Sequence, residues 1–289
     1  MKQRTITGLI LAVVLIPLLV LGGYFILALA VLLSYGAGYE LLNMFSTKVK
    51  GLKKYRFIFP LFSSLLVLTL FDTVTATHDW VFLFTMITAT FVSSLIITLF
   101  DSSLHMSDVG YLFITTIYSG IGFAVLAGVR NISNVGLVMD AKYLGLFLFI
   151  YLCASTMCTD MGAYFVGVNF GKHRLCPKIS PKKSIEGSIG GSIIGTIIGT
   201  IIFLLIQNHY GFKFNDSGFI NVLLIIVLTL LITIVGQIGD LVASKFKRDF
   251  GIKDYSNIFP GHGGILDRFD SLLLTGIFFY LICLNIGIL

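Results

Sequence analysis

The sequence has few charged residues, and this scarcity excludes a water-soluble globular protein. Only 12% of its 289 residues are charged, whereas 56% are hydrophobic, and the mean hydropathy is +0.97. Such a composition supplies too little polar surface to cover one core in water. Several apolar stretches approach or exceed the roughly 20 residues that cross a bilayer as a helix. The composition therefore predicts an all-α integral membrane protein.

Cysteine is also scarce, and its spacing excludes two common frameworks. Cys153, Cys158, Cys176 and Cys283 show neither a paired C-x-x-C spacing nor an accompanying histidine pattern. Neither a zinc site nor a disulfide framework is therefore expected. The basic N-terminus is followed by an apolar run that is too long for a signal peptide and lacks a clear cleavage site. We expect this run to be a retained first span.

Apolar runs bounded by polar residues predict a polytopic protein with about nine transmembrane helices. The expected spans are residues 6–21, 23–45, 57–71, 80–100, 109–129, 143–168, 185–206, 219–245 and 264–287. The third run is short, and little more than Gly22 and Gly23 separates the first two runs. Eight and ten spans are therefore the alternatives.

The basic residues predict the orientation of these spans. With nine spans and a cytoplasmic N-terminus, 17 of the 20 lysines and arginines fall on one side of the membrane and 3 on the other. Short cytoplasmic loops retain such residues. The net charge of +6 then lies at the cytoplasmic face, where it attracts anionic headgroups or a polyanionic substrate. Nucleic acid is not an expected partner, because no soluble basic domain or RNA-binding signature is present.

The two halves of the chain differ in their buried polarity. Residues 1–142 are predicted to be a scaffold of transmembrane helices and the probable lipid-facing part. Residues 143–289 are predicted to form the domain that holds the chemistry, with cytoplasmic loops at 171–184 and 246–263. The last four spans hold five carboxylates in or beside apolar sequence: Asp160, Glu186, Asp240, Asp267 and Asp270. A carboxylate there costs a few kcal/mol, so it usually has a partner or a task.

The seventh span carries small residues at a strict four-residue spacing, namely Gly187, Gly191, Gly195 and Gly199. Small residues at i and i+4 form a groove that another helix can approach closely. We expect packing within the subunit, and a homodimer is the alternative.

Two segments at the sixth and seventh spans hold candidate binding groups. Asp160-Met-Gly-Ala-Tyr164 lies late in the sixth span, and Ser180-Pro-Lys-Lys-Ser184 precedes the seventh. In the second segment Pro181 stiffens the turn, two lysines supply compact charge, and a helix N-terminus offers free N–H groups to a phosphate. The alternative is an ordinary basic loop that sets topology.

A third segment alternates oxygen ligands with cations. Asp240 and Ser244 are four residues apart on one helix, and Asp267 and Asp270 are three apart on the next, so each pair can share a helix face. Brought together, these helix ends would form an all-oxygen pocket suited to magnesium. Between them, His262-Gly-Gly264 allows the backbone to approach a ligand and predicts a phosphate seat.

Simpler interpretations of the third segment stay open. Asp267 and Asp270 could form salt bridges with Arg268 or Lys253 at a helix end, and His262 could only hold its loop. A metal site beside basic side chains suits nucleotidyl or phosphoryl transfer, which depends on positioning and charge neutralisation. A cation transporter with intramembrane aspartates is the main alternative, but it predicts paired repeats, and none is found. A transferase acting on another lipid is the second.

The motifs resemble the phosphatidate cytidylyltransferases, also called CDP-diacylglycerol synthases. The third segment matches their signature at every fixed position from Ser244 to Asp270, and the other two segments follow in the same order. The resemblance is strong over residues 155–275. The chain departs from the pattern at Met161, where a small hydroxyl residue is common, and at Ala243, where many members carry glutamate.

The resemblance implies that CTP and phosphatidic acid react to give CDP-diacylglycerol and pyrophosphate at the cell membrane, with an active site facing the cytoplasm. It implies Mg²⁺ and, in some members, K⁺. It implies metal ligands at Asp240, Asp267, Asp160 and Ser244. It implies catalytic groups at Asp240, Asp267, Asp270, Asp160, Lys247, Arg248 and Arg268. It implies phosphate-binding groups at Ser180, Lys182, Lys183, Ser184, Lys253, His262, Gly263 and Gly264.

Overall fold

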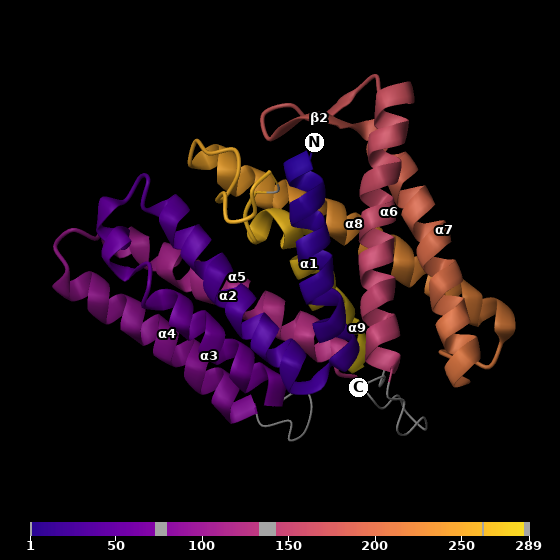
Figure 1. Cartoon of the computed structure of the whole chain (residues 1–289), viewed down its shortest axis with the longest axis horizontal. Coiled ribbons are helices and arrows are strands. Elements are labelled where there is room, and N and C mark those ends of the chain that lie inside the picture. Colours follow the sequence, from indigo (N-terminus) through magenta and orange to yellow (C-terminus); the bar gives the residue numbers. More distant parts are fainter. Residues whose placement is uncertain (1, 73–79, 133–142, 262, 286–289) are drawn as a thin grey trace. The chain divides into compact units, whose positions relative to one another are not determined.

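Helices dominate the part of the chain that the structure, a computed structural model, describes (Figure 1). The described residues are 2–72, 80–132, 143–261 and 263–285. The chain divides into two compact units. Unit 1 is Met1–Asn131 with Phe246–Phe269, and unit 2 is Ile132–Lys245 with Asp270–Leu289.

Unit 1 is a bundle built from the first five helices. They are α1 (Lys2–Leu21), α2 (Gly23–Phe45), α3 (Phe59–Asp72), α4 (Trp80–Phe100) and α5 (Val109–Arg130). Short 3₁₀ turns, η1 (Lys50–Tyr55) and η3 (Met106–Asp108), join some of them. Helices α2, α3 and α5 pack against one another and enclose the fully buried Leu41, Leu66, Leu112 and Phe123.

Small residues bring these three helices together. A Cβ added at Gly120 would lie 3.1 Å from Leu66, and one added at Gly38 would lie 3.3 Å from Pro60. Ser119 also donates a hydrogen bond of 2.9 Å to Ser63. Within a bilayer, close backbone approach and hydrogen bonds between helices replace the hydrophobic drive that packs soluble cores.

Unit 2 combines helices with a small hairpin. Its elements are α6 (Leu144–Phe170), β1 (Arg174–Cys176), β2 (Ser180–Ser184), α7 (Ile185–Tyr210), the part of α8 (Gly218–Asp249) up to Lys245 and the part of α9 (Leu266–Asn285) from Asp270. Strands β1 and β2 pair antiparallel. The hairpin lies within the predicted loop 171–184, where the sequence analysis expected no strand.

The glycines of α7 face α6. A Cβ at Gly191 would lie 2.5 Å from the Thr159 carbonyl oxygen, and one at Gly187 would lie 2.6 Å from that of Ala163. Larger side chains cannot enter so narrow a space without moving a helix. The expected packing of the glycine stripe within the subunit is therefore confirmed.

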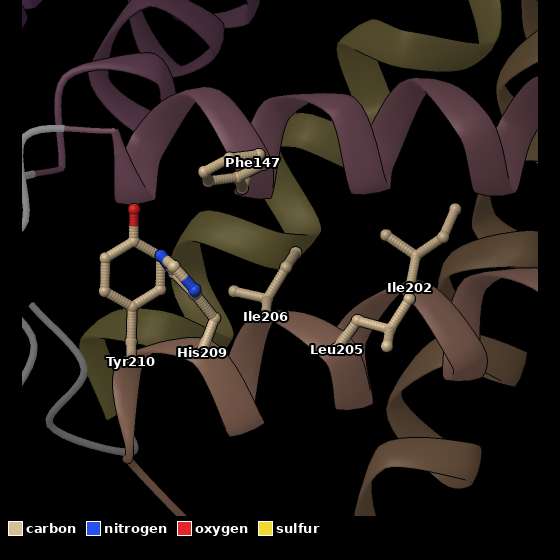
Figure 2. A pocket seen from close by; sticks show the side chains of 6 residues that line it. All are labelled: Phe147, Ile202, Leu205, Ile206, His209 and Tyr210. Atoms are coloured by element: carbon tan, nitrogen blue, oxygen red, sulfur yellow. The ribbon is translucent and has the colours of Figure 1, made fainter.

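Helices α6 and α7 also enclose a pocket of about 300 Å³ (Figure 2). Its lining is largely apolar and consists of Phe147, Ile202, Leu205, Ile206, His209 and Tyr210. Phe147 and Asp160 are 13 residues apart on α6, so the pocket lies about 20 Å along the helix from the carboxylate. It is therefore separate from the charged groups of unit 2.

The helices agree closely with the predicted spans, and no boundary differs by more than four residues. Among the described residues, six helices are long and apolar enough to cross a membrane: Gly23–Phe45, Val81–Phe100, Met106–Arg130, Leu144–Phe170, Ile185–Tyr210 and Gly218–Asp249. An all-α polytopic membrane fold is thereby supported. One loop boundary differs from the prediction, because α8 continues to Asp249 and shortens the loop expected at 246–263.

Candidate functional site

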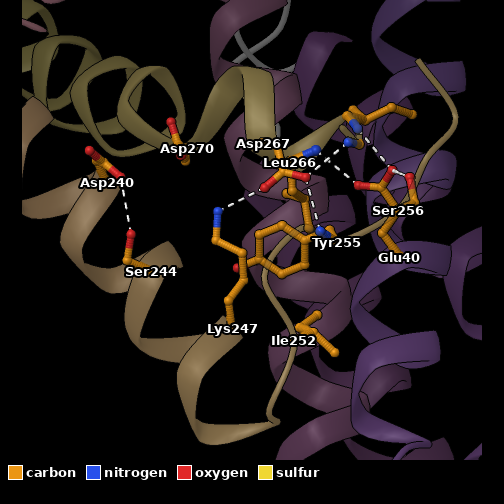
Figure 3. Close-up of polar contacts among 12 residues, drawn as sticks. Glu40, Asp240, Ser244, Lys247, Ile252, Tyr255, Ser256, Leu266, Asp267 and Asp270 are labelled. Carbon is orange, nitrogen blue, oxygen red and sulfur yellow. Dashed lines mark hydrogen bonds and ion pairs between the residues drawn. The ribbon is translucent and has the colours of Figure 1, made fainter. Parts of the chain in front are cut away.

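A charged cluster in unit 2 centres on Asp240 of α8. Its Oδ2 lies 2.5 Å from Nζ of Lys183, and its Oδ1 accepts a hydrogen bond of 3.3 Å from Ser244 (Figure 3). Both members of the ion pair keep about a quarter of their side-chain surface exposed. Asp160, on α6, is exposed and within electrostatic range of Asp240 and Lys183. The structure thus brings together two of the predicted carboxylates, one hydroxyl and one lysine.

The hairpin that carries Lys183 is fixed at both ends. Ser184 caps α7 by accepting a 3.1 Å hydrogen bond from the Gly187 amide, and its side chain is buried. Glu186, in the first turn of α7, accepts hydrogen bonds from the amides of Lys172 and His173 and contacts His173 Nδ1 at 2.6 Å. The capping serine and the glutamate therefore hold both ends of the hairpin at the start of α7. Lys182, on β2, is exposed.

A polar network one turn before Asp240 holds α8 against α7. Gln237 donates hydrogen bonds of 2.8 Å to Ser192 and 3.2 Å to the Ser188 carbonyl oxygen, and the Ser188 hydroxyl donates back to Gln237 Oε1. Helix α9 also passes close by, since a Cβ at Gly239 would lie 2.7 Å from the Asp270 carbonyl oxygen. These contacts restrict the position of Asp240, and the sequence analysis missed Gln237.

A second charged cluster, in unit 1, surrounds Asp267 at the start of α9. Its Oδ1 accepts a 2.7 Å hydrogen bond from Lys247, and its Oδ2 accepts hydrogen bonds of 2.9 Å from the amides of Tyr255 and Gly264 (Figure 3). Only 5% of the Asp267 side chain and 11% of the Lys247 side chain are exposed. Lys247 also lies over the Tyr255 ring. Both carboxylate oxygens of Asp267 thus accept hydrogen bonds from groups of the protein.

Glu40 of α2 belongs to the same cluster, and the sequence analysis did not single it out. The residue is fully buried, and its carboxylate accepts hydrogen bonds from Ser256, Ile265 and Leu266. The signal was available in the sequence, because Glu40 is the one acidic or basic residue in the apolar second span. Intramembrane ionisable residues mark sites with a task.

The remaining predicted residues are distributed around these clusters. Arg248, Lys253 and Arg268 are exposed, and Arg248 donates to the Ile252 carbonyl oxygen at 3.3 Å. His262 lies outside the described residues. Gly263 has a φ of +83°, a conformation that favours glycine, and the amide of Gly264 already donates to Asp267. Of the two departures, Ala243 is buried and Met161 is half-exposed.

The unit 2 cluster has the chemistry of a site for a hard cation. Carboxylate and hydroxyl oxygens are the ligands that magnesium prefers, and Asp160, Asp240 and Ser244 supply them. Within the described ranges, no group of three or more His, Cys, Asp or Glu residues was found that could hold a metal ion. The oxygens of Asp160, Asp240 and Ser244 thus fit magnesium in donor type only, and Lys183 is the present partner of Asp240.

The fold and the two lysine–aspartate pairs are those of a polytopic membrane protein with charged groups beside its apolar helices. Such groups suit an enzyme that acts on charged substrates at a bilayer. The sequence matches the Cytidylyltransferase family over residues 2–286. It is 35% identical over 278 residues to a phosphatidate cytidylyltransferase of Staphylococcus haemolyticus, and the matched region covers 95% of this chain and 96% of the relative. A Bacillus subtilis phosphatidate cytidylyltransferase is 34% identical over 282 residues, covering 97% and 96%. The chain belongs to the cytidylyltransferase family.

Family membership makes the chain an enzyme, a nucleotidyltransferase that uses CTP. It also confirms the resemblance that the motifs indicate and extends it from residues 155–275 to nearly the whole chain. Reactions of this class are metal-dependent. The acidic cluster in unit 2 is consistent with such a requirement.

Proposed function

We propose that the chain transfers CMP from CTP to phosphatidic acid, giving CDP-diacylglycerol and pyrophosphate for phospholipid synthesis. Relatives with this name match 95% of the chain or more. The observation that carries the proposal is the cluster of Asp160, Asp240 and Lys183, two carboxylates and a lysine beside one another. Such a set can hold a metal ion and a phosphate together, which is what a nucleoside triphosphate requires.

The proposed topology has nine spans, a cytoplasmic N-terminus and an active site that faces the cytoplasm at the cell membrane. The distribution of lysine and arginine supports it, because 17 of 20 fall on the side with the charged segments. Both substrates are anions, and CTP is dissolved in the cytoplasm. A basic face would raise the local concentration of anionic lipid and nucleotide. A homodimer stays a prediction.

The metal in this proposal is magnesium. Asp160, Asp240 and Ser244 would hold it, because their oxygens are the preferred ligands of a hard cation. When bound, magnesium would neutralise phosphate charge and polarise the α-phosphate of CTP. That Asp267 is a further ligand, and that potassium takes part, stay predictions. Asp267 already accepts hydrogen bonds from three donors and is 5% exposed, so a metal there would share the carboxylate with these donors.

The lipid phosphate needs no dedicated base in the proposed reaction. A phosphate monoester has a second pKa near 6, so it is largely dianionic at neutral pH. One of its oxygens attacks the α-phosphorus of CTP, and the bond from that phosphorus to the β-phosphate oxygen breaks. Pyrophosphate leaves with the electron pair. The chief obstacle is repulsion between two anions, so positive side chains beside the phosphates lower the barrier.

Basic side chains are assigned to this task in both units. In unit 2, Lys183 and the exposed Lys182 would bind phosphate, with Ser180 beside them on β2. In unit 1, Arg248, Lys253 and Arg268 are exposed and would contribute further positive charge. Ser184 caps α7 and the Gly264 amide donates to Asp267. A phosphate that bound either residue would therefore compete with these hydrogen bonds.

The test is CTP-dependent formation of CDP-lipid by the purified protein in mixed micelles with phosphatidic acid and magnesium. Wild type should form product, and Asp240→Asn should lower the rate by about 100-fold or more, because the charge that holds the metal is lost. Asp267→Asn should also lower it. Asp216→Asn, an exposed aspartate in the α7–α8 connection, is the matched control and should behave as wild type.

Two outcomes would contradict the proposal. Folded wild type that makes no product with phosphatidic acid, but does with another lipid phosphate, would favour a different substrate. Equal activity in wild type and Asp240→Asn would remove the unit 2 cluster from the chemistry.

A further inference from the structure

Glu40 is a buried carboxylate for which the proposed chemistry has no role. It is the one acidic or basic residue of α2 and has no exposed surface. An unpaired carboxylate inside a membrane protein costs several kcal/mol, so its partners determine what it does. The groups that donate hydrogen bonds to it are two backbone amides and a hydroxyl.

One amide belongs to Ile265, just before α9, and the other to Leu266, its first residue, while the hydroxyl lies in the preceding loop. Oε1 accepts hydrogen bonds of 2.8 Å from the Ile265 amide and 2.6 Å from Ser256, and Oε2 accepts one of 2.9 Å from the Leu266 amide (Figure 3). The first amides of a helix have no partner within the helix, and a negative charge there is favourable. Glu40 is thus the N-terminal cap of α9, supplied by a different helix.

The loop between Tyr255 and Leu266 is held by two carboxylates together. Asp267 accepts from the amides of Tyr255 and Gly264, at either end of the loop, while Glu40 accepts from Ser256, Ile265 and Leu266. This loop contains part of the signature that runs from Ser244 to Asp270, including the Gly263-Gly264 pair.

The two glycines fit between these carboxylates. A Cβ at Gly264 would overlap Glu40 Oε1, and one at Gly263 would lie 2.8 Å from Asp267 Oδ2. A side chain at either position would therefore displace one of the two carboxylates. The shape of the loop is therefore matched to Glu40, although more than 200 residues separate them in the sequence.

We propose that Glu40 is a positioning residue, which fixes loop 255–266 and the first turn of α9 and so holds Asp267 against Lys247. The inference rests on the proposed function, because it assigns Glu40 to the site that transfers CMP. A carboxylate that only stabilised the bundle would affect melting and leave the turnover of folded enzyme unchanged.

The test compares wild type with Glu40→Gln, which keeps the size of the side chain but places an NH₂ group against amide donors. The expected kcat is about 10- to 100-fold lower, the range seen when groups that orient a site are removed, with a smaller change in the KM for CTP. Hydrogen–deuterium exchange of peptides from 255–266 should be faster. Exchange in α4 should stay as in wild type.

Three further variants complete the test: one is a control, one removes a single donor to Glu40, and one disturbs the same contact from the loop. Ser34→Ala removes a buried hydroxyl from the same helix, where it bonds the Val31 carbonyl oxygen, and should leave kcat unchanged. Ser256→Ala removes one of the three donors and should lower kcat by less than about fivefold. If Glu40→Gln does not fold, Gly264→Ala tests the same contact, because the new methyl group displaces the carboxylate.

The outcomes separate this inference from the proposed function. If wild type makes no CDP-lipid, the proposed function fails, and faster exchange at 255–266 in the variant still decides whether Glu40 holds the loop. Folded Glu40→Gln with a kcat within about twofold of wild type overturns the positioning role. So does a lower kcat with unchanged exchange at 255–266.

Discussion

The two units each contain a lysine–aspartate pair, and the pairs differ in how many protein groups engage the aspartate. In unit 1, Asp267 accepts hydrogen bonds from Lys247 and two backbone amides, and only 5% of its side chain is exposed. In unit 2, Asp240 contacts Lys183 and Ser244, and 24% of its side chain is exposed. The same pair of residue types is thus set in two environments.

This difference indicates a division of labour. A carboxylate whose oxygens are taken up by backbone amides holds the chain in shape, as Asp267 and Glu40 do for loop 255–266. A carboxylate that faces side chains and remains partly exposed can exchange its partner for a ligand, as Asp240 can. We therefore infer that Asp267 and Glu40 position the loop, whereas the unit 2 cluster is available for the reacting groups.

The largest expected effect on stability comes from breaking the buried pair. Lys247→Met should lower the free energy of unfolding by about 3 kcal/mol or more, because it leaves Asp267 buried without its counter-charge. Thermal unfolding in detergent micelles, followed by circular dichroism, measures the effect. Activity should fall together with stability, since the loop held by Asp267 loosens.

Lys213→Met is the matched control for this change. Lys213 is exposed in the connection between α7 and α8, and its removal should leave the melting temperature unchanged. An equal melting temperature for Lys247→Met and wild type would show that the pair in unit 1 is not the structural one, and the comparison between the units would fail.

An intermediate effect is expected at the unit 2 pair, where stability and activity should separate. Lys183→Met should change the free energy of unfolding by less than about 1 kcal/mol, because the pair is partly exposed and Asp240 keeps access to solvent and Ser244. Turnover of CTP should nevertheless fall by about 10-fold or more, because a charge that offsets phosphate repulsion is removed.

Lys178→Met, in the turn of the same hairpin, provides the control. Lys178 is exposed, and neither the sequence nor the structure assigns it to the site. If Lys178→Met lowers turnover as much as Lys183→Met, general positive charge on the hairpin matters and the contact with Asp240 does not. A large loss of stability in Lys183→Met would show that the unit 2 pair is structural as well, and the contrast between the two pairs would fail.

The helices could be predicted from sequence because their signal is local. Each apolar run ends at polar or charged residues, so the boundaries of α2, α4 and α7 follow from the composition of a short window. The glycine stripe of α7 is likewise a local pattern, and its packing against α6 within the subunit follows from residue size.

The partners of the carboxylates could not be predicted in the same way. The resemblance implies that Asp240 and Asp267 are metal ligands, which stays a prediction, but it does not indicate their protein partners, which are Lys183 for Asp240 and Lys247 and Tyr255 for Asp267. Backbone amides carry no signal in the sequence, so the engagement of Asp267 by Tyr255 and Gly264 was invisible. Glu40 itself stands out as the one charged residue of its span, but its partners could not be predicted because they lie more than 200 residues away.

The hairpin was missed for a related reason. Residues 174–184 are rich in charge and contain Pro181, a composition that indicates a loop. The two short strands are held at their ends by contacts with α7: Glu186 accepts hydrogen bonds from the amides of Lys172 and His173, just before β1, and Ser184, the last residue of β2, caps the helix. Tertiary contacts at both ends therefore override a weak strand propensity.

The smallest effect is expected at a third lysine–aspartate pair, which extends the comparison to the surface. Lys54 is 62% exposed and lies 3.0 Å from Asp101, which also accepts hydrogen bonds from Ser103 and Tyr55. Hydrogen bonds from Ser103, and then those from Lys54 and Tyr55, hold the pKa of Asp101 well below its ordinary value.

A carboxyl whose pKa is lowered in the folded state stabilises the fold at any pH above its ordinary pKa. This stability is lost as the pH falls through the folded pKa. Lys54→Met should therefore melt slightly below wild type from pH 8 down to about pH 4, and the difference should shrink only at lower pH, as the pH approaches the lowered folded pKa and the carboxyl takes up a proton. A difference that grows on acidification would reverse this sign and remove the carboxylate as its cause.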